Sequence, residues 1–190
     1  MTFKQLSQDS WVVAPKLLGS LLIRELDCLT LVGKIVEVEA YDQFDAASHG
    51  YKGKTPRTEV MFGQAGHSYV YFTYGMHYCM NIVTGSVGHG SAVLIRALEP
   101  VEGIEQMRLN REGKTDHELS NGPAKLCQAL KIDRAFNGHD LTKSPLMLKI
   151  VDSQPNKGII QTTRIGISRE QNRKWRWYIK DNKFVSKLAK

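Results

Sequence analysis

Hydrophobic and polar residues alternate with a period of two through much of the first half of the chain. Successive side chains of a β-strand point to opposite faces of the sheet, so this alternation is typical of strands that have one buried face. The pattern predicts strands over residues 21–25, 31–41, 68–73, 78–83 and 92–98.

Helical signals are fewer and lie around these segments. Residues 12–18 have a helical pattern. A helix is predicted over residues 100–111, because its first residue is a proline, which the first turn of a helix tolerates. Another helix is predicted after Ser120 or Asn121, either of which can cap it, with Pro123 in its first turn.

Strands are predicted again over residues 146–151 and 175–179. Strands grouped in this way favour an α+β fold with a twisted antiparallel sheet and surrounding helices over alternating βαβ units. The composition, 42% apolar and 24% charged, is that of an ordinary folded protein. With no repeat and no linker-like stretch in the sequence, we expect a single domain over residues 1–190.

Several classes of protein are excluded at this stage. No apolar stretch approaches the roughly 18 residues of a membrane span, and the charged N-terminal region does not resemble a secretory signal. Cys28, Cys79 and Cys127 are odd in number and widely spaced, which predicts small buried residues in a reducing compartment rather than disulfides. We therefore expect a cytoplasmic protein, associated with the nucleoid if it is bacterial.

The sequence also lacks the motifs of common cofactor sites. The six histidines are scattered, and neither a His-x-Glu…Pro-Cys-x-x-Cys nor a His-Glu-x-x-His pattern occurs. There is no glycine-rich nucleotide fingerprint. We predict no metal and no cofactor.

The net charge of +7 lies entirely in the C-terminal segment. Residues 164–190 contain nine basic and two acidic residues, whereas the rest of the chain has 17 of each. Basic residues mixed with aromatic ones suit a polyanion such as nucleic acid, although a solvated terminal segment explains the same composition. The basic residues are Arg164, Arg169, Arg173, Lys174, Arg176, Lys180, Lys183, Lys187 and Lys190.

Candidate chemistry begins in the strand over residues 35–41. Its period places Glu37, Glu39 and Tyr41 on one face and the apolar residues between them on the other. Two carboxylates on one face are a candidate acid–base site, but an alternating strand with that face in solvent explains the same pattern and is the simpler interpretation of this segment alone. In the strand over 92–98, Arg96 interrupts an apolar run. A buried arginine needs a counter-ion, for which Glu39 or Glu37 is the candidate, unless Arg96 reaches solvent at an edge.

Residues 69–81 read as a protruding β-hairpin, with Gly75 in the connection and Tyr74, Met76 and His77 at or near the tip. Large apolar side chains at an exposed turn indicate insertion into a partner. Proteins that kink duplex DNA insert such a wedge between base steps. The alternative is a hairpin that folds back over its own core.

Together these segments resemble the alkyladenine (3-methyladenine) DNA glycosylase family of base-excision repair. The resemblance covers residues 17–148 and, with less specific motifs, 173–185. The segments that carry it are IVEVEAY (35–41), ASH (47–49), TPR (55–57), MF (61–62), YVY (69–71), YGM (74–76), CMN (79–81), LIRALEP (94–100) and NGPAKLCQAL (121–130). The chain departs from the family's pattern at Thr58 and Glu59, where Asn and Arg are familiar, and at His77, where an aromatic residue is familiar.

The resemblance implies roles for individual residues. Glu39 matches the general base that activates a water, and Arg96 matches the residue that helps to hold this water. The residues that match the base-binding pocket are Tyr41, His49, Tyr71, Asn81 and Leu94, with Asn81 screening bases by steric clash with exocyclic groups. The predicted DNA contacts are Tyr74, which fills the gap in the duplex, and Met76, His77, Arg57, Lys125, Arg173, Lys174 and Arg176.

The implied activity is hydrolysis of the N-glycosidic bond of alkylated purines, 3-methyladenine and 7-methylguanine, that are flipped out of double-stranded DNA. Hypoxanthine and etheno-adenine are further candidate substrates. The enzyme is expected to be monofunctional, because no lysine matches the position of a nucleophile. A monomer is expected, since nothing in the sequence demands a dimer. Two alternatives stay open: a non-catalytic nucleic-acid-binding module, and a hydrolase of free nucleosides.

Overall fold

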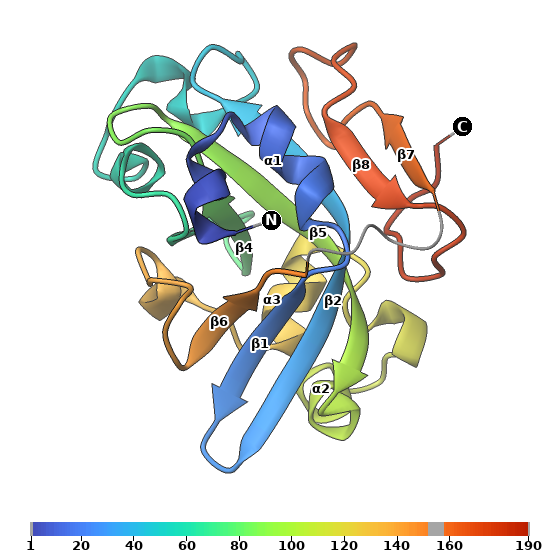
Figure 1. The fold of residues 1–190 in the computed structure, drawn as a ribbon. Helices are drawn as coiled ribbons and strands as arrows, with labels where there is room; N and C mark the ends of the chain where they lie inside the picture. The colour runs from blue at the N-terminus through green and yellow to red at the C-terminus, as the bar shows by residue number, and fades with distance from the viewer. Residues whose placement is uncertain (1, 152–157, 190) are drawn as a thin grey trace.

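A computed structural model describes residues 2–151 and 158–189 of the chain. Its centre is a twisted sheet in which every strand pairing is antiparallel (Figure 1). The strands are β1 (Leu21–Leu26), β2 (Leu29–Asp42), β3 (Ser68–Thr73), β4 (His77–Val83), β5 (Ser91–Glu102), β6 (Leu146–Lys149), β7 (Ile159–Thr162) and β8 (Arg176–Ile179). The structure confirms the predicted α+β class.

Helices and short 3-10 turns pack around this sheet. The α-helices are α1 (Ser10–Leu17), α2 (Ile104–Asn110) and α3 (Pro123–Ala129). The 3-10 turns are η1 (Phe3–Ser7), η2 (His49–Lys52), η3 (Glu59–Phe62), η4 (Asp116–Glu118) and η5 (Arg134–Phe136). Among the residues described, no helix has the length and apolar character of a membrane span.

The long strand β2 organises the sheet, whose order is β3-β4-β5-β2-β1-β6. One edge of β2 pairs with β5, and the other pairs first with β1 and then, over Glu37–Glu39, with β8. The C-terminal strands β7 and β8 therefore join the sheet beside the second half of β2 (Figure 1). This arrangement covers the segment that carries the two glutamates.

The core of the molecule joins the sheet to the helices. Leu17 of α1, Val38 of β2, Ile95 of β5 and Leu126 of α3 are all fully buried in one hydrophobic cluster. Burial of each such side chain contributes about 1.5–3 kcal/mol relative to exposure. Strands β2 and β5 are thus held rigidly against α1 and α3, and side chains on their other face have fixed positions.

The predicted helix over residues 100–111 is partly wrong. Pro100 lies in β5, opposite Gly33 and next to a register shift in β2, the kind of irregular site where a strand tolerates proline. The strand ends at Glu102 and is followed by Gly103, which has a positive φ of 71° and whose added Cβ would approach Leu31 to 2.4 Å. Helix α2 therefore begins only at Ile104. The helix predicted to contain Pro123 is confirmed, with Pro123 in its first turn, but its N-cap is Gly122 and not Ser120 or Asn121.

Strands β3 and β4 pair from Ser68↔Ile82 to Thr73↔His77, and Tyr74, Gly75 and Met76 connect them. Tyr74 and Gly75 both have positive φ, 52° and 68°. The Tyr74 side chain is 85% exposed and that of Met76 is 68% exposed. The alternative in which this tip folds back over the core is therefore wrong.

Candidate functional site

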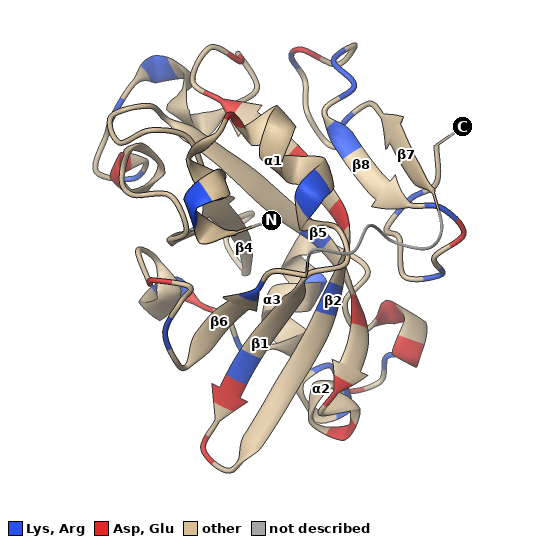
Figure 2. Cartoon of the chain, viewed as in Figure 1, with Lys and Arg blue, Asp and Glu red and all other residues tan. Residues whose placement is uncertain are grey.

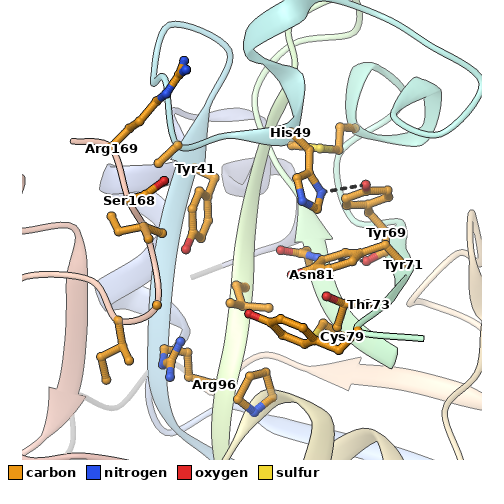
Figure 3. A pocket seen from close by; sticks show the side chains of 18 of the residues that line it. Tyr41, His49, Tyr69, Tyr71, Thr73, Cys79, Asn81, Arg96, Ser168 and Arg169 are labelled. Atoms are coloured by element: carbon orange, nitrogen blue, oxygen red, sulfur yellow. Dashed lines mark hydrogen bonds between the residues drawn. The ribbon is translucent and has the colours of Figure 1, made fainter. Parts of the chain in front are cut away.

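A cavity of about 490 Å³ opens between β2, the β3–β4 pair and the loop that follows β7 (Figure 3). Cavities of this size are typical of small-ligand sites. The residues that line it are Tyr41, Ala46, Ala47, His49, Met61, Tyr69, Tyr71, Thr73, Tyr74, Cys79, Asn81, Leu94, Arg96, Pro123, Ile165, Gly166, Ile167, Ser168 and Arg169. The predicted substrate contacts Tyr41, His49, Tyr71, Asn81 and Leu94 are all among them.

Aromatic rings form two sides of the cavity. In Figure 3, Tyr41 and the loop of Ser168 lie on one side, whereas His49, Tyr69 and Tyr71 lie on the other. The rings of His49 and Tyr71 are 4.5 Å apart at an interplanar angle of 78°. Aromatic walls favour a flat ligand that stacks and presents its edge to hydrogen-bonding groups. The cavity is therefore suited to a planar heterocycle.

The imidazole of His49 is uncharged at neutral pH. Its Nδ1 lies 3.0 Å from the Tyr69 hydroxyl, which fixes the ring orientation. Desolvation and then the positive charge of Arg57 lower its pKa to about 4, although the accessible surface of the residue as a whole is that of an exposed one. A neutral imidazole offers one donor and one acceptor. His49 can therefore read the edge of a ligand without delivering a proton.

Asn81 and Leu94 form part of the cavity floor, on paired positions of β4 and β5. The side-chain amide of Asn81 donates to the Tyr69 carbonyl at 3.1 Å. This bond uses one of the two N–H donors of the amide and leaves the other N–H and the side-chain carbonyl for other contacts. Both residues are at least nine-tenths buried, so they limit the depth to which a ligand can enter.

Glu39 is fully buried immediately behind the cavity wall. Its Oε1 accepts a hydrogen bond of 2.8 Å from the backbone N–H of Ile165. Its Oε2 accepts from the Tyr41 hydroxyl at 2.9 Å and from Arg96 Nη1 at 3.2 Å. All three donors line the cavity, whereas Glu39 itself does not. The carboxylate is thus held one group behind the cavity by the residues that form its surface.

Burial, followed by the charge of Glu39, raises the pKa of the Tyr41 phenol well above its ordinary value, so it remains a donor. Burial opposes the charge of Arg96, but Glu39 and Glu37 outweigh this effect and raise its pKa. Arg96 contacts both carboxylates, through Nε to Glu37 and Nη1 to Glu39, each at 3.2 Å. The predicted ion pair is present, and the alternatives of an exposed strand and an exposed Arg96 are wrong.

Glu37 anchors the C-terminal segment next to this site. Besides Arg96, it accepts from Arg176 Nε at 2.6 Å and from the backbone N–H of Ser186 at 2.6 Å. Arg176 is only 2% exposed, so the prediction that it contacts DNA is corrected: its guanidinium neutralises Glu37 in the interior. Arg164 is likewise buried, against Asp45, and does not belong to a basic surface.

The other basic candidates lie nearer to solvent. Arg57 is exposed, with its guanidinium 5.8 Å from the Tyr71 ring, and Lys125 Nζ donates to Asn121 Oδ1 at 2.7 Å. Lys174 is exposed, and Arg173 is paired with Glu170 at 2.7 Å; neither lines the cavity. Figure 2 shows Lys and Arg positions on β8 and its flanking loops, with acidic positions among them. Lys190 lies outside the described residues.

At the hairpin and the preceding turn, two departures from the family's pattern have local explanations. His77 Nδ1 is 3.5 Å from the side-chain nitrogen of Gln128, which brings the base of the hairpin next to α3. The Thr58 side chain is buried, and its hydroxyl lies 2.9 Å from that of Thr55 and donates to the Gly53 carbonyl at 3.2 Å. Thr58 therefore stabilises the turn that presents Arg57.

The sequence interpretation missed one side of the cavity, the loop of residues 165–169. The sequence had instead indicated that residues 164–190 form a basic surface. The only local signal is the apolar pair Ile165 and Ile167, which interrupts the charged residues. Within residues 2–151 and 158–189, His, Cys, Asp and Glu side chains form no group that could hold a metal ion.

Comparisons with known proteins identify the family to which the chain belongs. The model of the family described as methylpurine-DNA glycosylase matches residues 4–183. A relative from Carboxydothermus hydrogenoformans is 54% identical over 183 residues, or 95% of each chain. One from Francisella tularensis subsp. tularensis is 52% identical over 92% of each chain, and one from Methanoculleus marisnigri is 45% identical over 95% of each. All three carry the name "Putative 3-methyladenine DNA glycosylase". The chain therefore belongs to the methylpurine-DNA glycosylase family.

Proposed function

We propose that this protein is a monofunctional DNA glycosylase that hydrolyses the N-glycosidic bond of alkylated purines flipped out of duplex DNA. The observation that carries the proposal is the ion pair between Arg96, which lines an aromatic cavity, and Glu39, which lies directly behind its wall, with the exposed Tyr74 also bordering the cavity. A base inside this cavity has its sugar at the opening. The reacting bond then lies between the cavity and the duplex.

Glu39 acts as the general base. Its Oε1 has one protein donor, Ile165 N–H, and a carboxylate oxygen can accept a second hydrogen bond. A water bound there and beside Arg96 gives a proton to Glu39 as its oxygen attacks the sugar carbon. The carbon–nitrogen bond to the purine breaks, and the bond electrons leave with the base. The negative carboxylate also stabilises the oxocarbenium-like character of the sugar in the transition state.

The aromatic side chains select the leaving group. An N-alkylated purine is a cation, and a cation is attracted to the faces of aromatic rings such as Tyr41 and Tyr71. A cationic purine also departs without being protonated. Because the pKa of His49 is about 4, this residue is a weak candidate for protonating a neutral purine at pH 7. Alkylated bases are therefore favoured over hypoxanthine.

The hairpin supplies the means to extract the base. Tyr74 and Met76 are exposed at its tip, and Tyr74 also borders the cavity. Insertion of these side chains fills the gap that the flipped base leaves, for an unstacking cost of a few kcal/mol. Arg57, next to the Tyr71 ring, and Lys125 of α3 contact phosphates in this proposal. A damaged or mispaired base is extracted most easily, because its stacking and pairing are already weak.

The product is an abasic site in an intact strand. Cleavage of the backbone by a glycosylase needs an amine that attacks the sugar, and no lysine is among the residues that line the cavity in the described part of the chain. Water is then the nucleophile, and the reaction ends with base release.

The proposal is tested with duplexes that contain 3-methyladenine, 7-methylguanine, hypoxanthine or etheno-adenine, together with the free nucleosides. The expected result is release of free alkylated base from duplex, with strand breaks appearing only after alkali treatment. Failure to release any base would leave the non-catalytic binding module as the better description. Release from free nucleosides as fast as from duplex would favour the nucleoside hydrolase.

A further inference from the structure

Asp45 and Arg164 form an ion pair whose two side chains are both completely buried. Arg164 Nη2 donates to Asp45 Oδ1 at 3.0 Å, and Nη1 donates to Oδ2, so the contact is bidentate. Nη1 also donates to the Ala40 carbonyl of β2 at 2.9 Å. The pair joins segments that are 119 residues apart in the chain. Neither side chain lines the cavity.

Each partner is attached to a different wall of the cavity. Asp45 Oδ1 accepts the Ala47 N–H at 3.1 Å, and the Asp45 carbonyl accepts the Ser48 N–H at 2.8 Å. These bonds shape the turn that leads to His49. Arg164 directly precedes Ile165, whose N–H donates to Glu39. The loop then continues through Ser168 and Arg169, which face His49 across the cavity in Figure 3.

The guanidinium of Arg164 also supports the third wall. Its central carbon lies 4.7 Å from the centroid of the Tyr41 ring and 5.5 Å from that of Trp175. Trp175 in turn stacks on Trp11 of α1, with centroids 5.0 Å apart and an angle of 14°. Behind Tyr41 there is thus a rigid stack connected to the core. Tyr41 is fixed from behind by Arg164 and at its hydroxyl by Glu39.

We propose that the Asp45–Arg164 pair positions the catalytic site, by holding Tyr41, the His49 turn and the Ile165 N–H in the arrangement that base release requires. This inference rests on the proposed glycosylase function. Arg164 does not line the cavity and is a positioning residue. A buried ion pair contributes little net stability, because desolvation offsets the attraction, but it demands one geometry. A displacement of about 1 Å at a reacting group lowers a rate by as much as about 100-fold.

The test uses the full-length protein with Arg164→Lys, which keeps the charge but loses the planar fork, and with Asp45→Asn, which keeps the shape but loses the charge. Arg108→Lys is the matched control, since Arg108 makes a bidentate pair with Asp116 at 2.7 Å on the surface at α2. Base release is measured in single turnover with saturating enzyme, and affinity is measured with an abasic-site duplex. The maximal single-turnover rate constant does not change when part of the enzyme is merely unfolded, so it separates positioning from stability.

For Arg164→Lys and Asp45→Asn we expect the maximal rate constant to fall between about 10-fold and about 100-fold, with abasic-duplex affinity changed less than about threefold. The Arg108→Lys variant keeps the wild-type rate. An unchanged rate constant in either folded variant would overturn the inference, even if its thermal stability drops. A wild-type protein that releases no base would instead contradict the proposed function, and the inference would fall with it.

Discussion

The hydroxyl of Tyr41 donates a hydrogen bond of 2.9 Å to Oε2 of Glu39, while the same residue lines the cavity. In the proposed reaction, the wall that meets the flipped base therefore also orients the carboxylate that would activate water. The proposal thus couples substrate binding and water activation through one side chain.

Tyr41→Phe separates these two roles, because it keeps the ring and removes the donor. We expect the single-turnover rate of base release to fall about 10-fold, since Glu39 loses one of the three donors that orient it, while duplex affinity stays unchanged. Tyr178→Phe is the control: its hydroxyl accepts the Ala189 N–H at 3.1 Å, and it does not line the cavity. Equal rates for the wild type and Tyr41→Phe would show that this hydrogen bond has no catalytic role.

The proton affinity of His49 is a direct test of the cavity's electrostatics. We expect its ring to titrate near pH 4, below the usual 6.5, because of desolvation and the nearby charge of Arg57. An unfolded histidine is protonated below about pH 6.5, so His49 favours the folded state above that pH and loses this contribution as the pH falls toward 4. NMR titration of labelled histidine measures the value, and Arg57→Gln should raise it. A midpoint near 6.5 in the folded protein would contradict the account.

The hairpin tip is expected to matter for DNA and not for folding. Replacing both Tyr74 and Met76 with alanine should weaken binding to a lesion-containing duplex by about 10-fold or more, the effect of losing about 1–3 kcal/mol of stacking. The free energy of unfolding should stay within about 0.5 kcal/mol of the wild-type value, because both side chains are exposed. Leu109→Ala on α2, which is 73% exposed, is the control. An unchanged affinity in the double variant would exclude the wedge.

Two basic residues close together in the sequence should behave in opposite ways. Arg176→Gln leaves Glu37 with one guanidinium fewer in the interior and should lower the free energy of unfolding by about 3 kcal/mol. Lys174→Gln should leave stability unchanged, weaken DNA binding for all sequences, and reduce the salt-dependence slope by about 1. Urea unfolding and binding at several salt concentrations measure both effects. An Arg176→Gln protein with the wild-type free energy of unfolding would contradict the structural role of Arg176.

These contrasting residues show what the sequence could predict. Arg96 was paired correctly with Glu37 and Glu39, because a lone cation in an apolar strand needs a counter-ion. The same reasoning was not available for Arg164 and Arg176, which lie in a segment rich in charge. Their partners are 119 and 139 residues away, and a charge count does not reveal such distant pairs.

Strand positions were predicted well where alternation was regular, as in β3 and β4. The error at Pro100 arose because proline was interpreted as a helix start, whereas a register shift in the partner strand accommodates it. The loop of Ile165 was missed because its role depends on tertiary contacts with Glu39 and Asp45, not on a local pattern.

The most direct test of the central claim is single-turnover base release by Glu39→Gln from a duplex that contains 7-methylguanine. Glutamine keeps the size of the side chain and an oxygen that accepts hydrogen bonds, but it is not a base. We expect the rate constant to fall by about 100-fold to about 10,000-fold, the contribution of a general base, while the folded variant still binds an abasic-site duplex. Glu102→Gln, at the exposed end of β5, serves as the control. Base release at the wild-type rate by folded Glu39→Gln would contradict the assignment of Glu39 as the catalytic base.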